Sequence, residues 1–333
     1  MKKVVFVLSG LLVFCLSCSN LEAQTKQAAK PALPKNYQPL ALKPSPVLQT
    51  LLEKAVNETL TEFAAKKLTP NDVAATLFDL RDAKNIRTAS VRGDQKIYPA
   101  SVVKLFYLAA AHQWLETGAV KQLTPELTRG LKDMIVDSSN DATNYIVDVL
   151  TDTSSGGEIS PAELEIYGER RNAVNRYYQS LGYSNINVNQ KTYCEDAYGR
   201  EKQFRFDGKN RNMLTTDATA RLLSEIVLGR TVSPERSRQM MDLLKRDFSG
   251  TSKDADDQAH GFTAIALNKL NLKAAKLWSK AGWTSKTRHD AAYIEMPDGQ
   301  KFVLVVFTEN FADERDLIPI IAGKVLEGFA SIK

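Results

Sequence analysis

The chain alternates between stretches whose apolar residues repeat at every third or fourth position and short continuous apolar runs. The first pattern predicts helices, and the second predicts buried strands. Helical spacing is found in the segments 46–60, 101–117, 124–137, 141–150, 161–181, 216–228, 233–247 and 313–332. Strand-like runs are found at 73–80, 87–91, 276–284, 289–296 and 301–308, with a Pro-Asp-Gly turn before the last.

Strands near both ends of the chain, with helices between them, indicate an α/β (α+β) protein. We expect one α/β lobe built from residues 46–97 and 262–333, with a helical lobe, residues 98–261, inserted between them. A binding site is expected in the cleft between the two lobes. Two segments without periodicity, 182–214 and 249–270, lie inside this domain, and long irregular segments are typical of function.

The N-terminus has the pattern of an export signal. Two lysines precede the apolar run Val4–Leu16, which predicts a signal peptide over residues 1–23 with cleavage before Gln24. The alternative is a lipoprotein signal that ends before Cys18, which would tether the protein to a membrane. Residues 24–45 are rich in Lys, Pro, Ala and Gln and predict a flexible linker. We therefore expect a periplasmic or lipid-anchored protein of the cell envelope.

Composition excludes several other classes. The net charge of +5 is spread over 44 basic and 39 acidic residues, which argues against a nucleic-acid partner. The densest basic stretch, 199–211, either attracts an anionic substrate or cell-wall polymer or is a solvated loop. Cys194 is the only cysteine outside the signal region, so no internal disulfide is expected. No metal motif is present, and nothing in the sequence demands a cofactor.

The candidate chemistry begins with Ser101 and Lys104. Residues three apart on a helix lie on the same face, and Pro99 suits the start of the first turn. Lys104 is surrounded by apolar residues, and a lysine buried among them loses charge and is able to take a proton from the serine. Taken alone, the pair also fits a surface serine beside a lysine with an exposed ammonium group. A Ser-His-Asp hydrolase is not expected, because G-x-S-x-G is absent and the chain has three histidines.

Two further segments support the catalytic interpretation. They are Met134-Ile-Val-Asp-Ser138-Ser-Asn140-Asp-Ala-Thr-Asn144 and Leu277-Trp-Ser-Lys280-Ala-Gly282-Trp283. Together with Ser101-Val-Val-Lys104, they resemble, in order, the S-x-x-K, S-D-N and K-T-G motifs of the penicillin-recognising serine hydrolases. The resemblance is closest to class A β-lactamases and covers the chain from about residue 46 to its end. It implies a β-lactamase/transpeptidase-like fold with an antiparallel sheet.

The resemblance also implies roles for individual residues. Ser101 is the nucleophile, and its backbone N–H forms the oxyanion hole together with that of Trp283, which follows Gly282 of the third motif. Lys104 acts as base, directly or through water. Ser138 passes a proton to the leaving nitrogen, whereas helix capping is the alternative role for it and for Asn140.

The remaining implied roles concern binding. Asn140 holds Lys104 and a substrate amide, and Lys280 binds the substrate carboxylate. The chain departs from the family pattern at Ala281, where a threonine or serine is usual, so we expect weaker carboxylate binding unless Lys286, Arg288 or His289 compensates. A milder departure is Ser139 in place of the aspartate of S-D-N.

Two further departures concern turnover. Ser138 follows Ser101 by 37 positions, which is shorter than in typical class A enzymes and predicts a more open site. The deacylating glutamate of class A enzymes has no match in its usual E-P-E-L-N context. We assign this base to Glu201, with Glu195 as the alternative.

The expected function is hydrolysis of the β-lactam amide through an acyl-enzyme at Ser101, with a role in antibiotic resistance. One alternative is a D-alanyl-D-alanine peptidase, or a related amidase or esterase, that deacylates slowly. Another is a catalytically silent binding protein of the cell envelope. The expected partner is a small-molecule β-lactam or a D-alanyl peptide, and the oligomeric state stays open.

Overall fold

A single twisted sheet organises the protein. The computed structural model describes residues 33–34, 37–193 and 196–332. Within these residues the sheet has seven strands in the order β1-β3-β2-β7-β6-β5-β4. The strands are β1 Leu42–Pro44, β2 Val73–Asp79, β3 Ile86–Val91, β4 Lys245–Arg246, β5 Lys276–Trp283, β6 Thr287–Glu295 and β7 Lys301–Glu309. Neighbouring strands are antiparallel except β1 and β3, which confirms the predicted antiparallel sheet.

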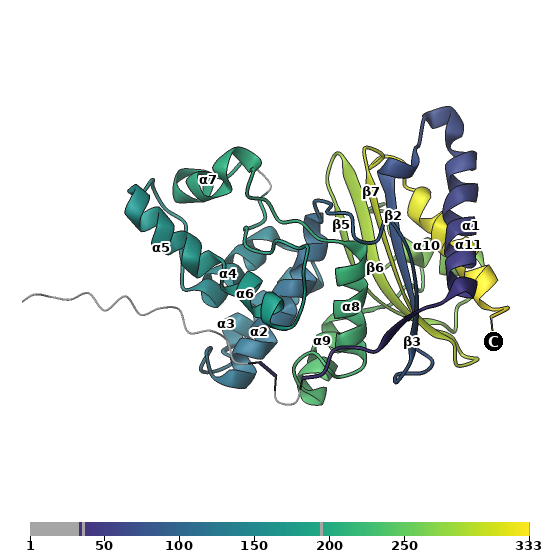
Figure 1. Cartoon of the computed structure of the whole chain (residues 1–333), viewed down its shortest axis with the longest axis horizontal. Helices are drawn as coiled ribbons and strands as arrows, with labels where there is room; N and C mark the ends of the chain where they lie inside the picture. Colours follow the sequence, from purple (N-terminus) through teal and green to yellow (C-terminus); the bar gives the residue numbers. More distant parts are fainter. Residues whose placement is uncertain (1–32, 35–36, 194–195, 333) are drawn as a thin grey trace, which may run out of the picture.

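Helices cover both faces of this sheet (Figure 1). Helices α1 (Pro46–Glu62), α10 (Thr263–Lys269) and α11 (Leu317–Phe329) pack together on one face, where α1 contacts β2 and β3. Helix α8 (Thr216–Val227) lies on the other face, against β2, β6 and β7. The sheet is thus buried on both sides, as its continuous apolar strands predict.

Local sequence explains where the first of these helices starts. The Ser45 hydroxyl accepts a hydrogen bond from the backbone N–H of Leu48, and Pro46 occupies the first turn, where its missing N–H costs nothing. The apolar face of α1, which includes Leu52 and Val56, is buried against the sheet.

The second lobe is helical and lies beside the sheet (Figure 1). Its helices are α2 Lys104–Thr117, α3 Pro125–Ile135, α4 Asn140–Thr151, α5 Pro161–Arg171, α6 Ala173–Ser180, α7 Gly199–Arg205 and α9 Pro234–Leu244. Helix α2 is buried on all sides from Lys104 to Leu115, so it is the central helix of the lobe. In the part of the chain that the structure describes, no helix combines the length and the apolar character needed to cross a membrane.

The structure differs from the sequence prediction in several places, and one of them is β4, which lies within the last residues of the helix expected over 233–247. The helix expected over 161–181 is interrupted at Asn172, which separates α5 from α6 and bonds its side chain to the Gly168 carbonyl. Helices α7 and α10 occupy segments predicted to be irregular. Strand β1 lies inside the predicted flexible linker, because pairing with β3 satisfies its backbone. The signal segment, including Cys18, lies outside the described residues.

Candidate active site

Ser101 lies on a tight turn at the base of the central helix. Residues Ala100–Val103 form a 3-10 turn, and α2 follows from Lys104. Ala100 adopts a positive φ of 46°, an uncommon conformation for a residue with a side chain. Side chains three apart lie above one another in a 3-10 turn, so Ser101 and Lys104 share one face, as the sequence predicts.

Strand β5 runs directly past this turn. A Cβ placed on Gly282 would lie 2.7 Å from the backbone nitrogen of Ser101 and 2.8 Å from that of Val102. Glycine is therefore required here, because any side chain would collide with the backbone of Ser101 and Val102. The third motif is thus brought against Ser101, with Trp283 as the next residue of the strand.

The amine of Lys104 faces the second motif. Its Nζ donates to the Ser138 carbonyl at 2.5 Å and to the Asn140 Oδ1 at 2.9 Å, and it lies 3.3 Å from the Ser138 Oγ. The Lys104 side chain is fully buried. The first and second motifs, far apart in sequence, are therefore joined through this lysine.

The segment between α3 and α4 presents Ser138 without using it as a helix cap. Ser139 is the residue that caps α4, because its hydroxyl accepts from the Ala142 N–H at 3.1 Å. Asn140 is the first residue of the helix, and its amide oxygen binds Lys104. Ser138 has a positive φ of 55°. The helix-capping role that was the alternative for Ser138 and Asn140 is therefore taken by Ser139.

Lys280 reaches the same serine from the other lobe. Its Nζ is 2.9 Å from the Ser138 Oγ and 2.7 Å from the Ala281 carbonyl, and the side chain is fully buried. Burial, followed by the nearby positive charges of Lys104 and Arg246, lowers the pKa of Lys280 well below its ordinary value. A negatively charged group beside the amine would oppose this shift, so the site is electrostatically suited to an anion.

Gln258 is a site residue that the sequence did not reveal. Its Oε1 accepts from the Lys280 Nζ and, at 3.3 Å, from the Ala281 N–H. Its Nε2 donates to the Ile135 and Val136 carbonyls at the end of α3. The side chain thus bridges the two lobes directly behind the lysine. It lies in a stretch without periodicity, and no sequence pattern marks it.

Two of the three residues considered as substitutes for the missing hydroxyl at Ala281, His289 and Arg288, have other partners. The His289 ring donates through Nε2 to the Tyr98 carbonyl and accepts through Nδ1 from the Thr308 N–H, and burial lowers its pKa to about 4. Arg288 forms an ion pair with Asp256, and Lys286 is exposed.

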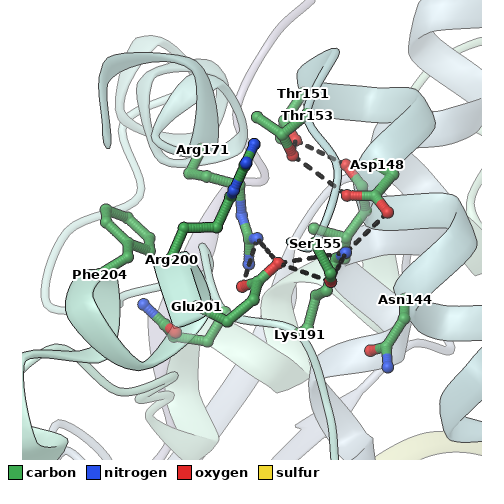
Figure 2. A network of polar contacts seen from close by, with 12 residues as sticks. Asn144, Asp148, Thr151, Thr153, Ser155, Arg171, Lys191, Arg200, Glu201 and Phe204 are labelled. Atoms are coloured by element: carbon green, nitrogen blue, oxygen red, sulfur yellow. Dashed lines mark hydrogen bonds and ion pairs between the residues drawn. The ribbon is translucent and has the colours of Figure 1, made fainter. Parts of the chain in front are cut away.

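Glu201 lies in a buried ionic cluster (Figure 2). Its carboxylate contacts the Arg171 Nη1 at 2.8 Å, the Lys191 Nζ at 3.1 Å and the Tyr167 hydroxyl at 2.7 Å, and it accepts from Ser155 at 3.1 Å. Although burial raises the pKa of Glu201, the two cations and the hydrogen bonds outweigh it and hold that pKa at about 2.

The cluster is joined to helix α4 at Asp148, beyond Asn140 along the helix. Lys191 also pairs with Asp148 at 2.6 Å, and Asp148 follows Asn140 by two turns, about 12 Å of helix. The structure thus brings together Ser101, Lys104, Ser138, Asn140, Lys280 and Gly282 but does not bring Glu201 into contact with them. The role of Glu201 as base stays a prediction, and its contacts favour a structural role. Glu195 lies outside the described residues.

The fold and the three motifs define a serine hydrolase of the β-lactamase type. The model of the Beta-lactamase enzyme family matches residues 121–329, well over half of the chain. The protein therefore belongs to this family, although the matched region begins after Ser101 and Lys104. A search of curated proteins found no match.

Solved structures support the same fold. A β-lactamase from Sphaerobacter thermophilus is 20% identical, with a TM-score of 0.61 over 84% of this chain and 99% of its own. An acyl-enzyme complex of a PBP-A mutant with penicillin G is 20% identical, with a TM-score of 0.60 over 89% of this chain and all of its own. A β-lactamase from Chitinophaga pinensis is 16% identical, with a TM-score of 0.58 over 83% and 99%.

Proposed function

We propose that the protein hydrolyses the amide bond of β-lactams through an ester at Ser101. The observation that carries this proposal is the meeting of two buried lysines, Lys104 and Lys280, at one serine, Ser138, beside the strained turn of the nucleophile. Shared hydrogen bonds of this kind link proton donors and acceptors in a single chain. Lys280 further supplies the positive charge that a substrate carboxylate requires.

The reaction balances with these groups and one water molecule, since the proton that Lys104 takes from Ser101 is the one passed on through Ser138. The Ser101 oxygen attacks the lactam carbonyl carbon while Lys104 takes its proton, and the Ser101 and Trp283 N–H groups stabilise the oxyanion. The carbon–nitrogen bond then breaks, and the ring nitrogen receives a proton through Ser138. Water hydrolyses the resulting ester and regenerates the serine.

A second candidate is a penicillin-binding peptidase whose acyl-enzyme persists. It is favoured by the contacts of Glu201, whose carboxylate is already occupied by two cations and two hydroxyl groups. The similarity of fold to the PBP-A acyl-enzyme complex points the same way.

Intact-mass spectrometry with excess penicillin G, sampled from seconds to hours, separates these functions. A transient adduct with loss of the drug supports the β-lactamase, and a lasting adduct supports the peptidase. The control is Ser101→Ala, which removes the nucleophile and leaves the rest of the cleft unchanged. An absence of adduct and of drug consumption would refute both and favour a binding role.

A further inference from the structure

A cavity of about 380 Å³ opens beside the segment that leads to the nucleophile. Among the described residues, its charged lining is Lys191, Arg205, Arg211 and one carboxylate, Asp196, and its uncharged lining includes Tyr98, Gln190 and Asn212. Tyr98 precedes Ser101 by three residues, so their Cα atoms are separated by about 11 Å at most. The chain thus holds one lining residue of the cavity close to Ser101, at a distance that the acyl side chain of a substrate is able to span.

The walls of this cavity are fixed by backbone pairing. Ile97 and Leu214 exchange two hydrogen bonds, of 2.8 and 2.9 Å, and this holds the segment of Tyr98 beside the segment of Arg211. The Asn212 amide oxygen accepts from the backbone N–H of Gln190 at 2.9 Å and so joins two further residues of the lining. A site with such supports is ready to bind without rearrangement.

The charges around the cavity are unevenly balanced. Lys191 is offset by Asp148 and Glu201, and Arg205 is paired with Asp196 at 3.3 Å. Arg211 instead lies over the Tyr98 ring, with its guanidinium carbon 4.2 Å from the ring centre. Within the described residues, no carboxylate lies within ion-pair distance of this guanidinium.

We propose that Arg211 binds an anionic group on the acyl side chain of the substrate, most simply a carboxylate. This inference rests on the proposed function, since it assigns a specificity to the same site. The planar guanidinium, oriented by its stacking on Tyr98, presents donors in a geometry that matches a carboxylate. The substrate class is therefore acyl compounds that carry a second negative charge on the acyl side, in addition to the carboxylate expected at Lys280.

The test compares two penicillins that differ by one carboxylate. Benzylpenicillin and its α-carboxylated derivative, carbenicillin, are reacted with the protein, and the second-order rate of Ser101 acylation is measured for each. We expect the wild type to prefer carbenicillin about tenfold, the value of one charge-assisted hydrogen bond. Arg211→Gln should abolish this preference and leave the rate with benzylpenicillin within about twofold of wild type. Arg211→Lys should keep part of it.

The matched control is Lys209→Gln, which removes an exposed cation two residues away, where the ammonium lies over Phe206. This variant should keep the wild-type preference, because Lys209 does not line the cavity. A preference near one in the wild type, or an equal fall for both drugs in Arg211→Gln, would overturn the proposal. The same loss of preference in Lys209→Gln would also overturn the proposal, because it would show a general attraction of the anionic drug to the positive charge of this region.

A second measurement does not depend on acylation. Phenylacetamide and the monoamide of phenylmalonic acid carry the two side chains with the acyl end capped as an amide, so that only the second bears a carboxylate, and their binding is compared by isothermal titration calorimetry. We expect the monoamide to bind the wild type about tenfold more tightly and the difference to vanish in Arg211→Gln. Equal binding overturns the subsite, whereas an absence of acylation by both drugs overturns only the proposed function.

Discussion

Replacement of Glu201 by glutamine tests whether the buried ionic cluster holds the helical lobe together. The substitution keeps the shape of the side chain but removes the charge that Arg171 and Lys191 share. The side chains of these two cations are 0% and 2% exposed, so water is unable to stabilise their charges once the carboxylate is removed. We therefore expect a large loss of stability and, where the protein is still folded, little change in the rate of deacylation.

The expected magnitude follows from two arguments. The pKa of Glu201 falls from 4.5 to about 2 on folding, which corresponds to about 3 kcal/mol at about 1.4 kcal/mol for each pH unit. Removing one partner of a buried ion pair costs a similar amount, about 3–5 kcal/mol. Because the folded-state pKa is depressed, this contribution is complete above pH 4.5 and is lost as the pH falls towards 2.

The assay is urea unfolding at pH 7, combined with the decay of the penicillin adduct measured by mass spectrometry. Glu165→Gln, an exposed glutamate on the same helix as Arg171, is the control and should change the stability by less than about 0.5 kcal/mol. A stable Glu201→Gln protein that no longer deacylates would refute this reasoning and establish Glu201 as the base. Glu195→Gln, measured in parallel, tests the other candidate.

Three further substitutions probe the site and its surroundings. Gln258→Ala should raise KM for penicillin about tenfold with little change in kcat, because Lys280 loses its acceptor; a fall in kcat alone would contradict this. Lys280→Met should abolish acylation. It should also raise the stability at pH 7 by about 1 kcal/mol, because folding depresses the pKa of this buried lysine. A loss of stability in urea unfolding would contradict the second expectation. The buried His112 ring has no hydrogen-bond partner among the described residues, and burial lowers its pKa to about 4. As the pH falls from 6.5 to 4, protonation of His112 should therefore lower the free energy of unfolding of the wild type by about 3 kcal/mol. Thermal unfolding of His112→Leu over the same pH range should show a correspondingly smaller loss of stability, and identical pH profiles of the two proteins would refute this.

Periodicity predicted the strands and the longer helices because each of them buries one continuous apolar surface. Helices α7 and α10 were missed because each has only seven residues, too few for a repeat to be visible. Strand β1 was missed because its three residues are stabilised by pairing with β3 rather than by their own side chains.

The candidate site likewise contains some residues that the sequence indicates and others that it does not. Motif spacing selected Ser101, Lys104, Ser138 and Lys280 as candidates, since each belongs to a motif of only three or four consecutive residues. Gln258 depends on contacts with residues at least 22 positions away, and no local pattern reports such contacts. The surroundings of Glu201, formed by α5 and by a segment near Lys191, were hidden for the same reason.

The backbone of Ala100 has a consequence for how this protein would change under selection. A residue with a side chain held at positive φ costs about 1 kcal/mol or more, and glycine would remove most of that cost. A library screened only for heat resistance should therefore accumulate glycine at this position. One screened for turnover should keep alanine if the strained turn is what aims the nucleophile. The two screens would therefore select different residues at position 100.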